Sequence, residues 1–173
     1  MMLRILLIHC LALAIGMQAS AADLIVPSKD YPTIQSAIAV ANGGDHVVVL
    51  PGTYFELINF QGKAITVRSS SGPGVTTIHG GGLGPVVQCV SGEGPGSVLQ
   101  GFTITGGNAS SGGGMYNFNS SPTVTNCDFI NNSATFGGGL HNNNSNPNVT
   151  GCRFIDNHAV ANPPFQCGGG GGM

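Results

Sequence analysis

Apolar residues recur with a period of 25 positions through the C-terminal half of the chain. The apolar columns, each read at intervals of 25 residues, are Leu99/Val124/Val149, Phe102/Cys127/Cys152 and Ile104/Phe129/Phe154. A fixed period of this length is typical of stacked structural repeats. Val124 and Cys127 are separated as at a bend, whereas Cys127 and Phe129 alternate as in a strand. We therefore expect one circuit per repeat, with equivalent strands pairing in parallel and the apolar columns facing inward.

Turn-forming residues repeat with the same period. Gly112–Gly114 returns as Gly137–Gly139, and a polar column contains Gly107, Asn132 and Asn157. Glycine permits turns that bulkier residues would block. Stacked asparagine side chains can hydrogen-bond to each other along the axis of such an array. These positions predict the corners of the coils.

A helical pattern occurs only near the N-terminus. Ile34, Ala37, Ile38 and Ala41 follow the spacing i, i+3, i+4, i+7, which predicts a helix over Thr33–Ala41 with one apolar face. Pro32 is suited to its first turn, and the residues 42–44 supply a left-handed stop. Because the ends of a solenoid are open strand edges, we expect this helix to cap the N-terminal end.

The remaining segments are short, β-branched or aliphatic, and bounded by turn residues. The predicted strands before the repeats are His46–Leu50, Leu57–Phe60, Ala64–Ser69, Thr76–His79, Val86–Val90 and Ser97–Thr105. The pattern predicts an all-β fold, a right-handed single-stranded parallel β-helix of about five coils with a short N-terminal capping helix. Gly170–Met173 matches the start of a further repeat, so we expect a chain truncated at its C-terminus, with further coils in a longer protein.

The N-terminal residues predict export. A basic start at Arg4, an apolar run to Met17 and the small residues Ala19-Ser20-Ala21 are typical of a secretory signal peptide over residues 1–21. The β-helix domain then covers residues 22–173, with no transmembrane helix after cleavage. Without Arg4 the chain has four Lys/Arg (5 − 1) and seven Asp/Glu, a net charge of −3 with His neutral. So few basic residues exclude a nucleic-acid-binding surface.

Two sets of motifs resemble known families. Tyr31–Ile38, Val47–Tyr54 and Gly62–Val67 resemble the opening of pectin-lyase-like right-handed β-helix proteins, which include pectate lyases, polygalacturonases and pectin methylesterases. Gly112–Met115 with Phe129–Asn132, and the repeat ending in Phe154–Asn157, are similar to polymorphic outer-membrane-protein repeats. The resemblance implies a parallel β-helix and a carbohydrate or cell-envelope context. It does not imply one activity, because this fold carries many functions.

Catalytic chemistry has few candidates in this chain. Lyases of the family use a basic residue with acidic Ca²⁺ ligands, and its hydrolases use clustered aspartates. The seven acidic residues that follow the signal peptide include no adjacent pair. Asp128 and Arg153 lie one period apart, so we expect a solvated ion pair between neighbouring coils, with Arg153 as a lyase base the alternative. His141 and His158 are expected to be lone surface residues. We predict no catalytic residue, no metal site and no cofactor.

Two further features remain open. Cys127 and Cys152 occupy one column, which is compatible with a disulfide and equally with stacked free thiols. Asn108 and Asn148 begin Asn-x-Ser/Thr triplets, for which a role in turns is sufficient.

The sequence favours a non-catalytic, secreted or cell-surface protein that contacts a polysaccharide or surface glycan, in adhesion or a related role. One alternative is a polysaccharide lyase or another pectin-active carbohydrate enzyme. A second alternative is a structural passenger segment of a larger surface protein. The binding residues are not identified by the sequence.

Overall fold

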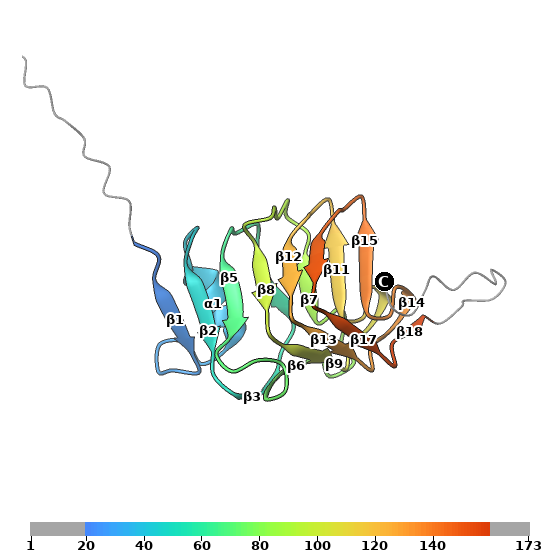
Figure 1. Cartoon of the computed structure of the whole chain (residues 1–173), viewed down its shortest axis with the longest axis horizontal. Coiled ribbons are helices and arrows are strands. Elements are labelled where there is room, and N and C mark those ends of the chain that lie inside the picture. The colour runs from blue at the N-terminus through green and yellow to red at the C-terminus, as the bar shows by residue number, and fades with distance from the viewer. Residues whose placement is uncertain (1–19, 160–173) are drawn as a thin grey trace, which may run out of the picture.

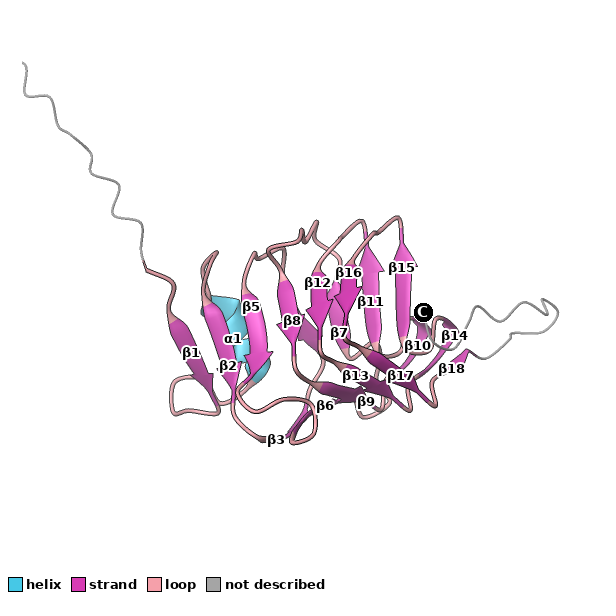
Figure 2. Ribbon diagram, in the orientation of Figure 1, coloured by secondary structure: helices cyan, strands magenta, loops and turns pink. Residues whose placement is uncertain are grey.

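The computed structural model describes residues 20–159, which form a parallel β-solenoid of about five turns (Figure 1). The strands lie in four parallel sheets, and the coils that begin at β8 and β12 contribute one strand to each of them, whereas the earlier coils contribute to fewer sheets. The predicted fold class, a mostly β parallel solenoid with one short helix near the N-terminus of the described residues, is confirmed (Figure 2). The signal peptide, apart from Ser20 and Ala21, and the repeat start at Gly170–Met173 lie outside the described residues.

The four sheets are named A to D. Sheet A contains β1 (Asp23–Val26), β2 (His46–Val49), β5 (Thr66–Ser69), β8 (Val98–Gln100), β12 (Thr123–Thr125) and β16 (Asn148–Thr150). Sheet B contains β3 (Gly52–Phe55), β6 (Thr76–His79), β9 (Thr103–Thr105), β13 (Asp128–Ile130) and β17 (Arg153–Ile155). Sheet C contains β4 (Ile58–Asn59), β7 (Val87–Cys89), β11 (Met115–Phe118) and β15 (Leu140–Asn143). Sheet D contains β10 (Asn108–Ser111), β14 (Ser133–Phe136) and β18 (His158–Ala159).

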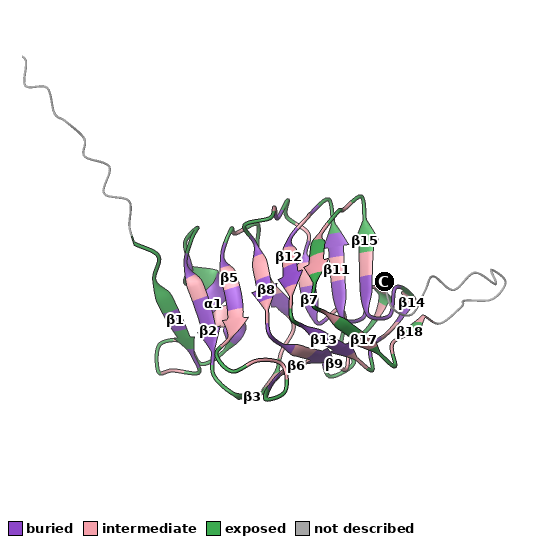
Figure 3. Cartoon of the chain, viewed as in Figure 1, coloured by how far each residue is buried: buried purple, intermediate pink, exposed green. Residues whose placement is uncertain are grey.

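The predicted apolar columns form the core. Strand register pairs Leu99 with Val124 and Val124 with Val149 in sheet A, and sheet B pairs Ile104, Phe129 and Phe154 in the same way. The first two members of each column are fully buried, whereas the last is only half-buried, because no later coil among the described residues covers it (Figure 3). The rings of Phe129 and Phe154 stack with their centroids 4.9 Å apart.

The predicted asparagine column is confirmed as a hydrogen-bonded ladder. The buried Asn132 side chain accepts from the amide of Gly107 at 2.9 Å and donates to the Asn157 Oδ1 at 3.0 Å and to the Ile104 carbonyl at 2.9 Å. Two glycines of the first triplet are required by contacts between coils, since a Cβ at Gly113 or Gly114 would collide with the carbonyl oxygen of Gly138 or Gly139 in the next coil.

The predicted helix is present as α1 (Ile34–Val40), and its predicted apolar face is buried. Two details differ from the expectation. Thr33 is the N-cap and forms a capping box with Ser36, so Pro32 precedes the helix instead of lying in its first turn. At the other end the helix stops before Ala41, which is extended (ψ 142°), whereas the left-handed residue predicted within residues 42–44 is present as Gly44.

Side chains hold the helix on the solenoid. They form hydrogen bonds with backbone groups at both ends of the helix and with the free edge of a neighbouring strand. The Glu56 carboxylate accepts the first amides of α1, from Ile34 and Gln35. The Gln35 side chain exchanges two hydrogen bonds with the backbone of Asn59 in β4, as a neighbouring strand would. Lys63 Nζ donates to two carbonyls near the C-terminal end of α1. These contacts fix the helix over the edge of β4, as expected of a helix that caps a solenoid.

Some strand boundaries were predicted incorrectly. Ser97–Thr105 is divided into β8 and β9, because Gly101 between them adopts a left-handed φ of +78°. The strands β1, β3 and β10 were not predicted. Among residues 20–159, no helix is long and apolar enough to cross a membrane.

Candidate binding face

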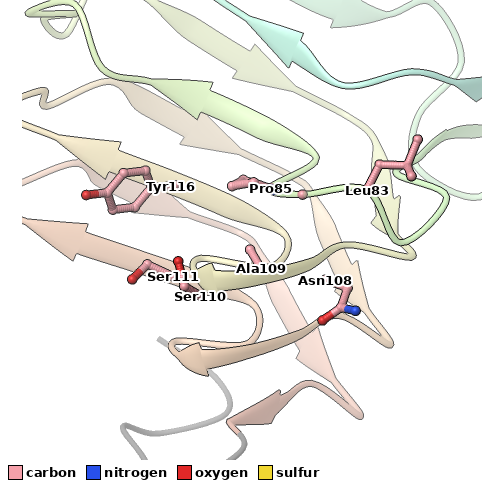
Figure 4. A pocket seen from close by; sticks show the side chains of 8 residues that line it. Leu83, Pro85, Asn108, Ala109, Ser110, Ser111 and Tyr116 are labelled. Carbon is pink, nitrogen blue, oxygen red and sulfur yellow. The ribbon is translucent and has the colours of Figure 1, made fainter.

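A hollow of about 420 Å³ lies on the outer surface between a glycine-rich loop and the first strand of sheet D. Its lining residues are Leu83, Gly84, Pro85, Asn108, Ala109, Ser110, Ser111 and Tyr116 (Figure 4). The loop connects β6 to β7, and its Gly84 carbonyl accepts a hydrogen bond from the Asn108 amide at 3.2 Å. Sheet D begins only at β10, so the loop lies where an earlier strand of that sheet would otherwise pair.

Tyr116 reaches this hollow because β11 alternates. Met115 and Asn117 are fully buried, so Tyr116 and Phe118 point outward from sheet C. The ring of Tyr116 stacks on that of Phe118, with centroids 6.5 Å apart, and on that of His141 in the next coil, at 5.9 Å and an interplanar angle of 15°. Two neighbouring coils therefore share one continuous aromatic surface.

Phe136 extends this surface to sheet D. It ends β14, pairs in register with the hollow-lining Ser111, and lies 6.1 Å from the His141 ring. Phe118 and Phe136 are 40% and 47% exposed, which is high for large apolar side chains. We call Tyr116, Phe118, Phe136 and His141 the aromatic cluster. It is continuous with the hollow through Tyr116 and Ser111.

Neither the hollow nor the aromatic cluster includes an Asp, Glu, Lys or Arg residue. The polar groups that line the hollow are the Asn108 amide and the hydroxyl groups of Ser110, Ser111 and Tyr116. The face can therefore offer aromatic surface together with neutral hydrogen-bond donors and acceptors.

The predicted ion pair between Asp128 and Arg153 is present on sheet B, but it is not a fully solvated pair. Arg153 Nε lies 2.7 Å from Asp128 Oδ1, and a second guanidinium nitrogen contacts Oδ2. The arginine side chain is 67% exposed, whereas the aspartate side chain is only 6% exposed. The hydrogen bonds and the charge of Asp128 raise the pKa of Arg153. A raised pKa opposes loss of a proton, so this geometry does not prepare Arg153 to act as a base.

Cys127 and Cys152 are free thiols, and so is Cys89 in sheet C. Cys127 is buried and its Sγ lies 3.4 Å from the Thr125 carbonyl oxygen. The side-chain hydrogen bond with Cys152 and burial raise the pKa of Cys127, while the same hydrogen bond lowers the pKa of Cys152 to about 7. Cys127 is therefore the less acidic and Cys152 the more acidic thiol of the pair.

His141 is not the lone surface residue that the sequence predicted, since it contacts Tyr116 and Phe136. His158 borders a second hollow of about 240 Å³ in the last described coil, together with Asn131, Asn132, Ser133 and Asp156. Within residues 20–159, no three His, Cys, Asp or Glu side chains are grouped so that they could hold a metal ion.

Comparison with protein-family models, curated proteins and solved structures gives no match for this chain. The candidate site is therefore argued from its geometry. Sequence reasoning missed Tyr116, Phe118, Phe136 and the loop at Leu83–Pro85. The available signal was the alternation of β11, which places Tyr116 and Phe118 on the outer face beside the repeated glycines.

Proposed function

We propose that this chain is an exported, non-catalytic β-solenoid that contacts an uncharged polysaccharide or surface glycan at the cell envelope or in the extracellular space. The observation that carries the proposal is the aromatic cluster lying continuous with a hollow lined by neutral polar groups. The resemblance to pectin-lyase-like and outer-membrane repeat proteins, based on motifs such as Val47–Tyr54 and Gly112–Met115, agrees with this context.

The chemistry of a sugar ring fits such a face. A pyranose has an apolar C–H surface and a rim of hydroxyl groups. Aromatic rings pack against the first, and amide or hydroxyl side chains hydrogen-bond with the second. Tyr116 supplies the aromatic surface, and Asn108 with Ser111 supplies polar contacts at the same hollow.

The arrangement also favours a polymer over a single sugar. Gln88, Tyr116 and His141 are paired in register on successive coils and point outward from sheet C. Successive coils are ~4.8 Å apart, so this row offers contacts along the solenoid axis over a distance comparable with more than one sugar unit. A linear glycan can follow the row from the hollow.

The absence of charge at this face separates the proposal from its first alternative. A lyase acting on polygalacturonate needs basic groups and bound cations near the carboxylates of its substrate. Arg68 and Arg153, both on outer surfaces of other sheets, are paired with Asp23 and Asp128. The lyase alternative therefore rests on the resemblance alone.

A glycan array containing both neutral polysaccharides and polyuronates tests the proposal. We expect binding to neutral polymers, with no release of unsaturated products when the protein is incubated with polygalacturonate and Ca²⁺. Product release would instead support the lyase alternative. If the protein neither binds a glycan on the array nor releases product, glycan contact is contradicted and a structural passenger segment is favoured.

A further inference from the structure

Asp45 is a buried carboxylate that lacks a cationic partner. Its residue is 7% exposed, and none of the ion pairs among residues 20–159 includes it. One oxygen, Oδ2, accepts a hydrogen bond from the Asn42 amide at 2.8 Å and so closes the turn after α1. The other oxygen, Oδ1, accepts a hydrogen bond from the backbone nitrogen of Ala22, also at 2.8 Å. Buried carboxylates normally have a charged partner, so the residue that contacts Oδ1 is of interest.

Ala22 lies at the boundary between the expected leader and the fold. Its carbonyl accepts a hydrogen bond from the His46 amide at 2.8 Å, and β1 begins at the next residue, Asp23. Ser20 and Ala21, just before it, are exposed. The small residues Ala19-Ser20-Ala21 are the sequence pattern expected before a signal-peptidase cut. The nitrogen atom that contacts Asp45 is therefore the atom that this cut would release.

We propose that the chain is processed between Ala21 and Ala22 and that the released α-ammonium group of Ala22 forms an ion pair with the Asp45 carboxylate. In this hydrolysis one water molecule is consumed and the C–N bond between the two alanines breaks. Ala21 keeps a carboxylate, and the nitrogen of Ala22 becomes an ammonium group. A neutral amide donor is thereby replaced by a cation at a position already within hydrogen-bond distance of Asp45.

The charged and titratable groups around this site come from three strands. Asp23 in β1 and His46 in β2 contact each other at 3.2 Å, and Arg68 in β5 lies 3.8 Å from Asp23. The adjacent helix α1 contains no charged residue, and Lys63 is occupied with carbonyls at its C-terminal end. The hydrogen bonds from Ala22 and Asn42 already lower the pKa of Asp45, so its carboxylate is charged at neutral pH and ready to receive a cation.

The pairing has a defined pH signature. An α-amino group in an unfolded chain has a pKa of about 7.7–8.0. Pairing with Asp45 raises that pKa in the folded protein. The resulting stabilisation is fully present below the unfolded pKa and is lost as the pH rises through the folded pKa. It should therefore begin to decline above about pH 8 and disappear only at a pH above the raised, folded-state pKa.

The first experiment locates the processing site. The full chain is produced in a secreting host, and the intact mass and N-terminal sequence of the exported protein are measured. We expect a chain that begins at Ala22. A protein that begins at another residue, or that keeps its leader, would overturn the proposal. Glycan binding plays no part in this result, so it is independent of the proposed function.

The second experiment tests the ion pair. Two purified proteins, one beginning at Ala22 and one at Ser20, are unfolded with denaturant from pH 6 to pH 10. We expect the unfolding equilibrium constant of the Ala22 protein to be about tenfold lower at pH 6–7, which corresponds to one pKa unit, and the difference to vanish towards pH 10. The titrating side chains are common to both proteins and cancel, and the α-amino group of the Ser20 protein belongs to an exposed residue two positions before the nitrogen that contacts Asp45.

Asp45→Asn, which keeps a carbonyl oxygen acceptor, should abolish the difference between the two proteins. Asp30→Asn, at an exposed aspartate, is the matched control and should preserve it. Identical pH profiles for the Ala22 and Ser20 proteins would show that no ion pair forms.

Discussion

In the last three coils, the turns are closed by uncharged side chains that recur every 25 residues, whereas the first coils use carboxylates that each occur once. Register shows the same contrast. His46 pairs with Thr66 and Thr66 with Val98, giving coils of 20 (66 − 46) and 32 (98 − 66) residues. Val98 pairs with Thr123 and Thr123 with Asn148, giving two coils of 25 residues (123 − 98 and 148 − 123).

The irregular coils rely on individual acidic side chains. The buried Glu93 accepts hydrogen bonds from the amides of Gly62 and Ser91 and from the Ser120 hydroxyl, each at 2.8 Å. It thereby joins three consecutive corners of the solenoid. Asp45 and Glu56 bind backbone amides in the same manner around α1.

The difference has a physical origin. A carboxylate repeated in one column would place like charges ~4.8 Å apart on neighbouring strands, which is destabilising. Asparagine donates and accepts without charge, so Asn132 and Asn157 can stack. A regular repeat therefore selects neutral corner residues, and carboxylates are confined to corners that occur once.

The largest expected effect comes from truncating the core of the regular coils. Phe129→Ala removes a fully buried ring between two coils and should reduce the free energy of unfolding by about 3–5 kcal/mol. Phe154→Ala, in the same column but half-buried in the last described coil, should cost about 1–2 kcal/mol, because less apolar area leaves water there. Denaturant unfolding of both variants measures the difference. Equal losses would contradict the assigned register of sheet B.

The next effect concerns the asparagine ladder. Asn132→Ala leaves the amide of Gly107 and the carbonyl of Ile104 without their partner in a buried corner, which should cost about 2–4 kcal/mol. Asn157→Ala removes the end of the same ladder at a more exposed position and should cost about half as much. Thermal unfolding of the two variants provides the comparison. A larger loss for Asn157→Ala would rule out the ladder as described.

A smaller effect, but one with a specific pH dependence, is expected at Glu93. Burial alone would raise the pKa of Glu93, but the hydrogen bonds from Gly62, Ser91 and Ser120 outweigh it and lower the pKa below its ordinary value. A lowered folded-state pKa gives stability that is present above the unfolded pKa, about 4.3, and is lost as the pH falls through the folded value.

Glu93→Gln should therefore cost about 1–3 kcal/mol at pH 7, the usual size for a buried hydrogen-bonded charge, and progressively less below pH 4. Unfolding of wild type and variant between pH 3 and pH 7 measures this. Glu56→Gln, at a less buried carboxylate that also accepts two backbone amides, is the comparison and should cost less at pH 7. A constant difference across this range would contradict the role assigned to Glu93.

The regular half of the fold could be predicted because each inward position is repeated. The strands of the irregular first coils were harder to predict from the sequence. Gly52–Phe55 follows Pro51 and is absent from the predicted strands, yet it pairs in register with β6. Asn108–Ser111 contains no large apolar residue, and it is a strand because β14 supplies its backbone partners. Tertiary pairing outweighs local propensity in both segments.

The candidate site could not be found from the repeat, because its aromatic residues do not repeat. One period after Phe118 the chain has Asn143, and one period before Phe136 it has Ser111. Repeated positions build the coil, whereas outward positions are free to vary. The proximity of Tyr116 to the loop at Leu83–Pro85 depends on the length of the 32-residue coil that begins at β5, which the sequence pattern does not reveal.

The most direct test of glycan contact compares two exposed aromatic residues. Tyr116 stacks on His141 and lines the hollow, whereas Phe55 lies 5.0 Å from His79 on sheet B and neither of these two lines it. The measurement is calorimetric titration of the best neutral polysaccharide from the array into wild type, Tyr116→Ala and Phe55→Ala. We expect Tyr116→Ala to weaken binding at least tenfold, equivalent to about 1.4 kcal/mol, and Phe55→Ala to leave it unchanged. Unchanged affinity in Tyr116→Ala, or an equal loss in both variants, would contradict the assignment of this face.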